Sequence, residues 1–399
     1  MTSTTVSTPP ETRRHPALAW IAVVAVACGT FSIVTTEMLP VGLLTLIGPD
    51  IGVSTGASGQ LMTTASVAAV ISALTIMIVA GRVDRRILLV GMMTVLLTAN
   101  VVTAIVDSYA LLLAARILVG FAIGGFWAIG ASLAVRLVPE ESVARASAII
   151  ISGISIASVV GVPAGTFIGD HSGWRAAFVS MAGLSLLVLI ALAFFLPKLP
   201  SSGSLRVSDL TDLLRRSPVR AGLLSLLLIV VGHFAAYTYV TPVLSASAGL
   251  EGPTVAVLLL VYGVAGIAGT FIAGALAGRY LQAVVVGSAV FLVAAMAAVP
   301  TVADGSFTAA VVLVVWGLGY GAVPVGLQVW TLRSAPEAPE GVSVLFVACF
   351  QVAIGTGAVL GGLAVDRIGV TAPMWLGALA AAVAVALVLG TARSVVTRD

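Results

Sequence analysis

Long apolar stretches follow one another along the whole chain, separated by short groups of charged residues, glycine and proline. Only 9% of the residues are charged, whereas a soluble domain carries roughly a quarter, so polar groups cannot cover the folded surface. A membrane span needs ~20 mostly apolar residues, which each stretch supplies. We therefore predict an all-α integral membrane protein with twelve transmembrane helices. They are expected at 17–46, 57–80, 87–106, 109–135, 144–168, 174–196, 220–245, 254–277, 282–302, 306–331, 341–364 and 370–391.

One hydrophilic segment, 197–219, interrupts this pattern between the sixth and seventh predicted spans. It is rich in proline, serine and arginine, which is typical of a linker. We therefore predict a disordered tail at 1–16, a six-helix half at 17–196, a cytoplasmic linker at 197–219, a second six-helix half at 220–392 and a tail at 393–399.

The basic residues indicate how these helices cross the membrane. With the N-terminus inside, 16 of the 19 Lys and Arg residues fall in cytoplasmic segments, and only Arg175 and Arg367 fall outside. Cytoplasmic loops carry such an excess, so both termini are predicted to be cytoplasmic. The protein is expected in the cell membrane, that is, the inner or plasma membrane.

The two predicted halves repeat each other. Four residues of the first half recur 196 positions later at the same relative places, which supports two parallel six-helix pseudo-repeats. The pairs are Gly161 and Gly357, Gly165 and Gly361, Asp170 and Asp366, and Gly173 and Gly369.

Three ionisable residues fall at membrane depth: Glu37 in span 1, Arg116 in span 4 and His233 in span 7. Such residues are costly in the bilayer and often mark proton or substrate paths. We interpret Glu37 as a carboxylate that takes and releases protons, with Arg116 close enough to hold it ionised. A static ion pair joining spans 1 and 4 is the alternative. His233 could bind substrate, relay protons or bond a neighbouring helix.

Small residues recur every fourth position in spans 5 and 8, a pattern that lets helix backbones approach closely in lipid. Spans 5 and 8 belong to different halves, so we predict that these stripes form the interface between the halves. The alternative is packing within one half. The residues assigned to this interface are Gly161, Pro163, Gly165, Gly266 and Gly274.

Several motifs resemble those of the drug–proton antiporter branch of the major facilitator superfamily. Gly81-Arg82-Val83-Asp84-Arg85-Arg86 resembles its loop motif between spans 2 and 3, although the later glycine and final basic pair are missing. Arg116-Ile117-Leu118-Val119-Gly120 is similar to its span-4 motif, and Gly161-Val162-Pro163-Ala164-Gly165 to its span-5 antiporter motif. The resemblance implies the twelve-span major facilitator fold, proton-coupled export, a role in conformational change for Gly81, Arg82, Asp84, Arg85 and Arg86, and proton coupling for Glu37 and Arg116.

Within that branch, Glu37-Met38-Leu39-Pro40-Val41-Gly42 and Gly124-Gly125-Phe126-Trp127-Ala128 are most similar to purine ribonucleoside efflux transporters. The resemblance implies a nucleoside substrate, with multidrug or sugar and arabinose efflux as alternatives. Aromatic and polar side chains on the predicted cavity helices could bind it, unless some of them face lipid. These candidates are Phe126, Trp127, His233, Phe234, Tyr237, Trp316, Tyr320, Gln328 and Gln351.

Other function classes lack their sequence signals. We find no metal-ligand cluster, nucleophile–base pair or Gly-rich phosphate loop, so neither an enzyme nor an ATP-driven pump is expected, and no cofactor beyond the proton gradient. A sensor or channel is a more distant alternative. Cys28 and Cys349 lie in apolar stretches and predict no disulfide. The expected partners are a small-molecule substrate, protons and the lipid bilayer, with no nucleic acid, and the protein is expected to be a monomer.

Overall fold

The computed structural model describes residues 16–79, 83–130, 133–199 and 207–395, and within these ranges the regular elements are all helical. Helices suit the membrane because each satisfies its own backbone hydrogen bonds without water. We call residues 16–199 the N-terminal half. Its elements are α1 (Pro16–Ile51), α2 (Thr55–Val79), α3 (Arg85–Ile105), α4 (Tyr109–Gly130), α5 (Leu133–Leu137), η1 (Glu140–Ser142), α6 (Val143–Ile156), η2 (Ala157–Gly161), α7 (Val162–Ser172) and α8 (Trp174–Phe195).

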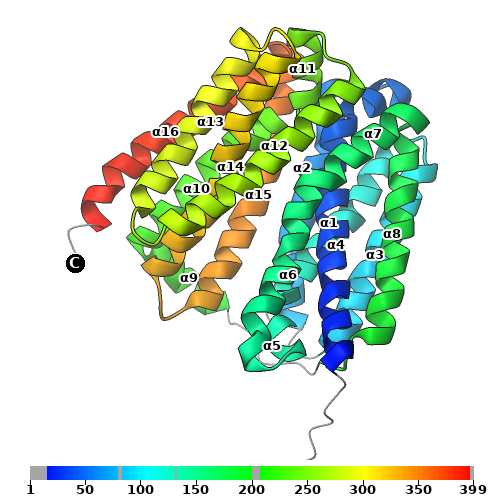
Figure 1. The fold of residues 1–399 in the computed structure, drawn as a ribbon, viewed down its shortest axis with the longest axis vertical. Helices are drawn as coiled ribbons and strands as arrows, with labels where there is room; N and C mark the ends of the chain where they lie inside the picture. Colours follow the sequence, from blue (N-terminus) through cyan, green and yellow to red (C-terminus); the bar gives the residue numbers. More distant parts are fainter. Residues whose placement is uncertain (1–15, 80–82, 131–132, 200–206, 396–399) are drawn as a thin grey trace, which may run out of the picture.

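Residues 207–395 form what we call the C-terminal half. Its helices are α9 (Val207–Arg215), α10 (Ser217–Tyr237), α11 (Val240–Ala248), α12 (Gly252–Leu276), α13 (Leu281–Val302), α14 (Ser306–Ser334), α15 (Pro339–Arg367) and α16 (Ala372–Val395). One large apolar core lies within the N-terminal half, and the core of the C-terminal half extends to Val41, Leu44, Met62 and Val162 of the N-terminal half. The two halves stand side by side; α1 begins at the lower end of the molecule, and α16 runs downward to end at the left edge, above the start of α1 (Figure 1).

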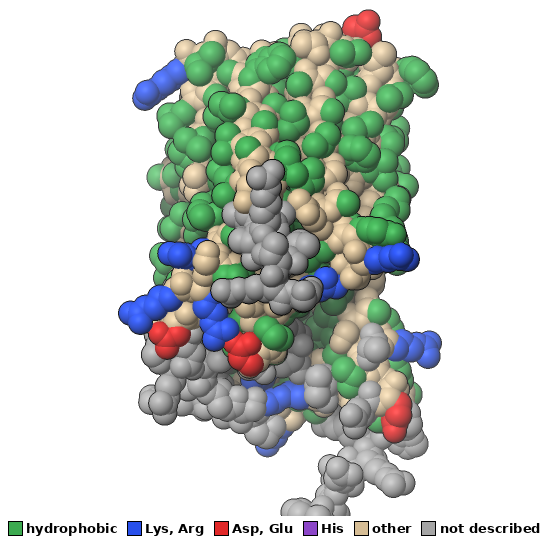
Figure 2. All heavy atoms as spheres, turned by 90° about the vertical axis from the view of Figure 1, so that its left-hand side faces the viewer, with side chains coloured by type: hydrophobic (Ala, Val, Ile, Leu, Met, Phe, Trp, Pro, Cys, Tyr) green, Lys and Arg blue, Asp and Glu red, His purple; other side chains and the backbone are tan. Residues whose placement is uncertain are grey.

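We call this lower end the terminal face and the other end the opposite face. Charged side chains gather toward the terminal face, and a broad apolar surface extends above them (Figure 2). Among the described residues, 11 helical segments are long and apolar enough to cross a membrane. The helix α2 occupies the place of the predicted second span but is not one of these 11, so twelve spans stay a prediction.

The predicted seventh span is broken into α10 and α11 at Thr238 and Tyr239. Proline has no backbone N–H and its ring clashes with the carbonyl four residues earlier, which for Pro242 is the carbonyl of Thr238. This explains why the chain bends there. The predicted linker also contains a helix, α9, whose Leu210 and Leu213 are buried beside Gly341 of α15. Arg216, the residue that follows α9, forms an ion pair with Glu337.

The repeated glycines pack within each half, which corrects their assignment to the interface between halves. A side chain at Gly161 would meet Thr35 of α1, and one at Gly165 would meet Leu39. In the other half, Gly357 and Gly361 lie in the same way against α10. Their neighbours are the backbones of Val231 and Ala235, again 196 positions after Thr35 and Leu39. The sequence repeat is therefore also a repeat of packing: each stripe lets one helix approach the first long helix of its own half.

The small residues predicted in span 8 are also turned away from the N-terminal half. Gly266 lies nearest to the carbonyl of Gly317 in α14, and Gly274 has open space where its side chain would be. Spans 5 and 8 nevertheless do meet, because α12 packs against η2 and α7. At that contact Gly263 lies against the backbone of Ser158 and Val159. The predicted helix pair is correct, but other residues form it.

Contacts between the halves gather toward the opposite face. There α15 packs on α2, and α11 packs on α1. Thr241 donates a hydrogen bond to the carbonyl of Val41 at 3.1 Å, and Thr63 donates one to the carbonyl of Gly355 at 3.2 Å. Near the terminal face, by contrast, α5 and α6 diverge from α9 and α15 (Figure 1).

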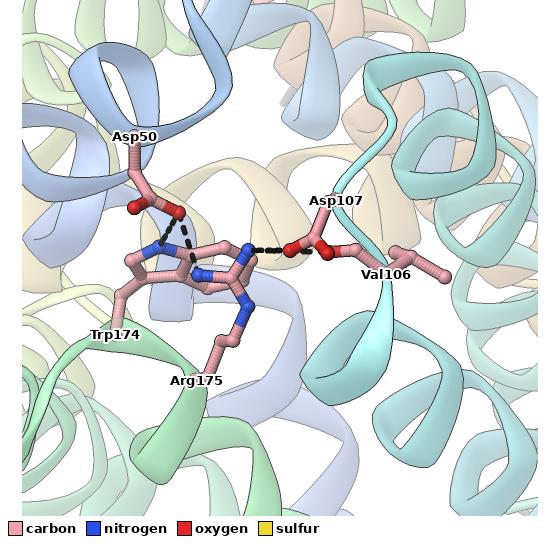
Figure 3. A network of polar contacts seen from close by, with 5 residues as sticks. All are labelled: Asp50, Val106, Asp107, Trp174 and Arg175. Atoms are coloured by element: carbon pink, nitrogen blue, oxygen red, sulfur yellow. Dashed lines mark hydrogen bonds and ion pairs between the residues drawn. The ribbon is translucent and has the colours of Figure 1, made fainter.

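The ends of three helices of the N-terminal half are tied together at the opposite face (Figure 3). Arg175, at the start of α8, forms ion pairs with Asp50 at the end of α1 and with Asp107 between α3 and α4. Trp174 donates its indole N–H to Asp50 at 3.1 Å, and the guanidinium of Arg175 lies 4.2 Å from the centre of the Trp174 ring. These bonds hold the ends of the helices together at this face.

Candidate functional site

Glu37 lies on α1 with only 5% of its surface exposed, where α1 faces the C-terminal half. Its Oε1 atom accepts a hydrogen bond of 3.2 Å from the Nε2 atom of Gln351 on α15. Gln351 is itself buried, and its Oε1 atom has no hydrogen-bond partner in the described part of the protein. A buried carboxylate and a buried amide therefore join the two halves. Because removing one partner would leave the other unsatisfied, this contact is sensitive to any change in either group.

Arg116 is buried on α4, beside α1, as its predicted role requires, but it forms no ion pair with Glu37. Its Nη1 atom donates instead to the carbonyl of Thr36 at 2.9 Å. That carbonyl is available because Pro40, four residues later, has no N–H to donate to it. The static ion pair that the sequence left open as an alternative is thus not formed, and Arg116 bonds the peptide group next to Glu37 instead.

The rest of the Arg116 guanidinium faces an aromatic ring. Its central carbon lies 5.1 Å from the centre of the Phe178 ring, within the range of a cation–π contact. Its Nη2 atom has no hydrogen-bond partner among the described residues. The positive charge therefore lies near Glu37 without neutralising it by direct contact.

Six aromatic side chains cluster inside the C-terminal half, and we call them the aromatic cluster. They are His233, Phe234 and Tyr237 on α10, Tyr262 on α12, and Trp316 and Tyr320 on α14. His233 is fully buried and stacks on Tyr320, with ring centres 3.5 Å apart and planes 8° apart. The ring centres of two further neighbours, Tyr237 and Tyr262, lie 5.1 Å and 6.4 Å from the ring centre of His233. Four sequence-predicted cavity residues thus surround His233.

A hydrogen bond fixes the orientation of the His233 ring. Trp316 donates its indole N–H to Nδ1 of His233 at 3.0 Å, so Nδ1 is an acceptor and the hydrogen of the neutral ring lies on Nε2. The Nε2 atom has no partner in the part of the chain that the structure describes, and neither has the hydroxyl of Tyr262. The cluster therefore combines stacking faces with two buried polar groups that lack protein partners.

The remaining predicted cavity residues lie elsewhere. Phe126 is fully buried in the core of the N-terminal half, and Trp127 is half-buried beside it, with ring centres 6.4 Å apart. Gln328 is exposed on α14. Of the two glutamines, the structure therefore brings only Gln351 together with another predicted site residue.

The loop motif between α2 and α3 is described only in part, because Gly81 and Arg82 lie outside the described residues. Asp84 caps α3 by accepting from the backbone N–H of Arg86 at 2.8 Å, and it also accepts from the N–H of Leu199 at 3.0 Å. The Arg85 N–H donates to the carbonyl of Leu199, and the guanidinium of Arg86 donates to the carbonyl of Ala193. The motif thus ties the start of α3 to the end of α8 within one half.

Sequence reasoning missed two features of this site. Pro40 carried a usable signal, since a proline inside a span exposes a carbonyl that a buried arginine can reach. Tyr262 carried none, because an isolated tyrosine in an apolar helix gives no indication of which helix it faces. Among the described residues, no group of three His, Cys, Asp or Glu side chains could hold a metal ion. What the site offers is one buried carboxylate, buried hydrogen-bonding groups and stacking surfaces.

Comparison with known proteins gives a family and relatives. The sequence model of the Major Facilitator Superfamily matches residues 26–354. The purine ribonucleoside efflux pumps NepI of Salmonella paratyphi B and of Salmonella enteritidis PT4 are each 36% identical to this chain over 360 residues. In both cases 90% of this chain and 90% of the relative are covered.

Solved structures with a similar fold include a bacterial homologue of the human lysosomal transporter Spinster. In its inward-facing and occupied conformation it superposes with a TM-score of 0.75 at 16% sequence identity, covering 95% of this chain and 98% of that one. In its inward-facing and unoccupied conformation the TM-score is 0.71 at 14% identity, covering 94% and 95%. At such low identity the likeness concerns the fold alone.

Proposed function

Because the chain belongs to the Major Facilitator Superfamily, we propose that it exports a small solute in exchange for protons, and that this solute is a purine ribonucleoside. The observation that carries the proton coupling is the hydrogen bond between Glu37 and Gln351, which joins the two halves at a buried carboxylate. The proposal includes no catalytic residue and no bound cofactor, since the proton gradient supplies the energy.

Proton binding at Glu37 would change this contact directly. An ionised carboxylate accepts a charge-assisted hydrogen bond from the Gln351 amide, which is roughly twice as strong as a neutral one. A proton on Glu37 removes the charge and so weakens the bond that holds α1 to α15. The protonation state of one residue would thereby bias how closely the halves approach, which is the coupling that an antiporter requires.

The nucleoside assignment rests on the NepI relatives and on the aromatic cluster. A purine base offers a flat face for stacking, and aromatic rings that stack offset gain ~0.5–1.5 kcal/mol per pair beyond their burial. His233 and Tyr262 carry the polar atoms that lack protein partners, and so could bond the base or the ribose. Drug efflux and sugar or arabinose efflux use the same coupling and are the alternatives.

The orientation follows from the basic residues. With both termini cytoplasmic, the terminal face is the inner one and the face at which the halves meet is the outer one. The protein would then be an inner- or plasma-membrane monomer whose halves diverge on the cytoplasmic side.

The experiment is uptake into everted membrane vesicles, whose outer surface is the cytoplasmic side. Respiration acidifies the vesicle interior, and labelled inosine or guanosine should then accumulate in vesicles that contain the wild-type protein. Glu37→Gln should abolish this accumulation, while exchange of labelled for unlabelled nucleoside without a proton gradient persists. Glu141→Gln, a change of the same chemistry at an exposed site, is the matched control and should behave as wild type.

The outcomes separate the parts of the proposal. Normal gradient-driven accumulation by Glu37→Gln would contradict its role in coupling. If an arabinose or a cationic dye is accumulated and no nucleoside competes, the substrate assignment fails and the exporter assignment stands. If no solute responds to the proton gradient, proton antiport itself is wrong.

A further inference from the structure

A carboxylate of one half caps a helix of the other half at the opposite face. Asp366, at the end of α15, accepts a hydrogen bond of 3.0 Å from the backbone N–H of Gly56, in the first turn of α2. Its other oxygen accepts one of 2.6 Å from the hydroxyl of Ser54, the residue before α2. Ser54 in turn accepts from the N–H of Ala57 at 3.1 Å. Two of the N–H groups that the first turn of α2 leaves without helical partners are thus satisfied, one of them from the other half.

The approach is close enough to require glycine at position 56. A β-carbon there would lie 2.4 Å from Oδ2 of Asp366 and 2.5 Å from the carbonyl of Gly362. The carboxylate also carries its negative charge to the positive end of the α2 dipole, where anions are favoured. Since α2 and α15 belong to different halves, this cap exists only while the halves touch at this face.

The sequence repeat places a second carboxylate in the same relation on the other side of the molecule. Asp170 precedes Asp366 by 196 residues, and Gly252, at the start of α12, follows Gly56 by the same number. A β-carbon on Gly252 would lie 2.1 Å from Oδ2 of Asp170, so the carboxylate lies directly against the first residue of α12. Here α7 of the N-terminal half approaches a helix of the C-terminal half, the reverse of the Asp366 contact.

The two contacts are not equally complete. Oδ2 of Asp170 has no hydrogen-bond partner in the described chain, whereas both oxygens of Asp366 are bonded. A cavity of about 410 Å³ adjoins Asp170, and it is also lined by Thr45, Thr241 and Glu251 from both halves. The Asp366 side is therefore closed by direct bonds, whereas on the Asp170 side the carboxylate packs against Gly252 beside this cavity.

We propose that Asp366 and Asp170 are a symmetry-related pair of positioning residues, each holding the first turn of a helix in the other half, and that together they keep the opposite face closed. Neither residue touches the aromatic cluster or Glu37. The inference requires that the halves separate and rejoin at this face, and it does not depend on the identity of the solute or on proton coupling.

The test is a distance measurement between spin labels at the opposite face. Ser108 and Ser306 are exposed there, in the N-terminal and C-terminal halves respectively, and each is replaced by cysteine after removal of Cys28 and Cys349. The full-length protein is reconstituted in lipid nanodiscs and measured by double electron–electron resonance without solute or pH gradient. The wild type should show mainly the short distance of the closed face.

Asp366→Asn should increase the ratio of long to short distances by about twofold to fivefold, because the amide oxygen can still accept from the start of α2 while the negative charge at this helix end is lost. Asp170→Asn should shift the ratio in the same direction. Asp304→Asn is the matched control, because Asp304 is an exposed carboxylate at the same face that accepts from Thr308 within its own half. It should leave the ratio unchanged.

A second route covers the case in which Asp366→Asn does not fold, as judged by gel filtration. Gly252→Ala displaces the Asp170 carboxylate by its β-carbon alone and should also lengthen the distances. Unchanged distances in both the Asp170→Asn and Gly252→Ala proteins would overturn the pair, as would opening in only one of the two aspartate variants. If the variants show the predicted distance changes but the wild-type protein takes up no nucleoside, the proposed function fails and this inference stands.

Discussion

Arg116 of α4 donates a hydrogen bond to the carbonyl of Thr36 in α1, and it can do so because Pro40 leaves that carbonyl without its helical partner. The proline and the arginine thus act together, although they are 76 positions apart in the chain. The hydrogen bond from Arg116 to Thr36 holds α1, the helix that carries Glu37, beside α4.

This relation predicts non-additive stability. Arg116→Leu should destabilise the protein by ~1–3 kcal/mol, because the buried Thr36 carbonyl loses its donor. In a Pro40→Ala background the N–H of residue 40 can satisfy that carbonyl, so the same replacement should cost less. Thermal unfolding of the four proteins in detergent measures the difference. Equal costs in the two backgrounds would mean that the carbonyl bond is not what Arg116 contributes.

The bond between Trp316 and His233 predicts a similar cycle inside the aromatic cluster. Trp316→Phe leaves Nδ1 of His233 without a donor, and His233→Phe leaves the indole N–H without an acceptor, so each should cost ~1–3 kcal/mol. The double variant removes both polar atoms and should be more stable than the sum of the single costs predicts. Thermal unfolding followed by circular dichroism checks this, and strict additivity would contradict it.

Gln351 should matter for coupling more than for folding. Gln351→Ala removes the amide that bonds Glu37, and bonds to charged groups contribute ~1.5–3 kcal/mol, so proton-driven nucleoside uptake should fall by roughly tenfold or more relative to exchange. Gln282→Ala, on α13 and away from Glu37, is the control. The ratio of gradient-driven uptake to exchange in everted vesicles is the readout. A ratio as high as that of the wild type would show that Glu37 works without Gln351.

The contact between α12 and the N-terminal half gives a steric prediction. A β-carbon on Gly263 would lie 2.8 Å from the Ser158 carbonyl and from the α-carbon of Val159, and backbone atoms cannot move aside cheaply. Gly263→Ala should therefore separate the halves and reduce both thermal stability and transport. Gly274→Ala, on the same helix but in open space, should be tolerated. Equal behaviour of the two variants would argue against a close contact at Gly263.

Much of the fold could be predicted from the sequence, because apolar length indicates where helices cross and the 196-residue repeat indicates that the two halves are built alike. The pairing of spans 5 and 8 was predicted from their stripes of small residues, and α12 does pack against η2 and α7. The faces were not: the stripe of Gly161 and Gly165 packs on α1, since a small-residue pattern specifies close approach but not the partner.

The candidate site was predictable in its members and not in its contacts. Glu37, Arg116 and His233 stand out because ionisable groups are rare in apolar helices. That Gln351 bonds Glu37 depends on how the halves are tilted against each other, which no local pattern encodes. The break at Thr238 could have been found from Pro242, whereas the stacking of His233 on Tyr320 depends on side-chain positions in three packed helices.

The short π-helix η2 sets the rotational phase of α7 relative to α6. The Val162 N–H donates to the carbonyl of Ala157, five residues earlier rather than four, so this turn holds one residue more than an ordinary helical turn. Without that extra residue, everything after it would rotate by about 100° relative to α6. Ser158 and Val159 could then no longer face α12 while Gly161 and Gly165 face α1. A single residue in the chain length thus determines which neighbour each face of this helix meets, so a one-residue deletion here would alter the contact between the halves more than many substitutions would.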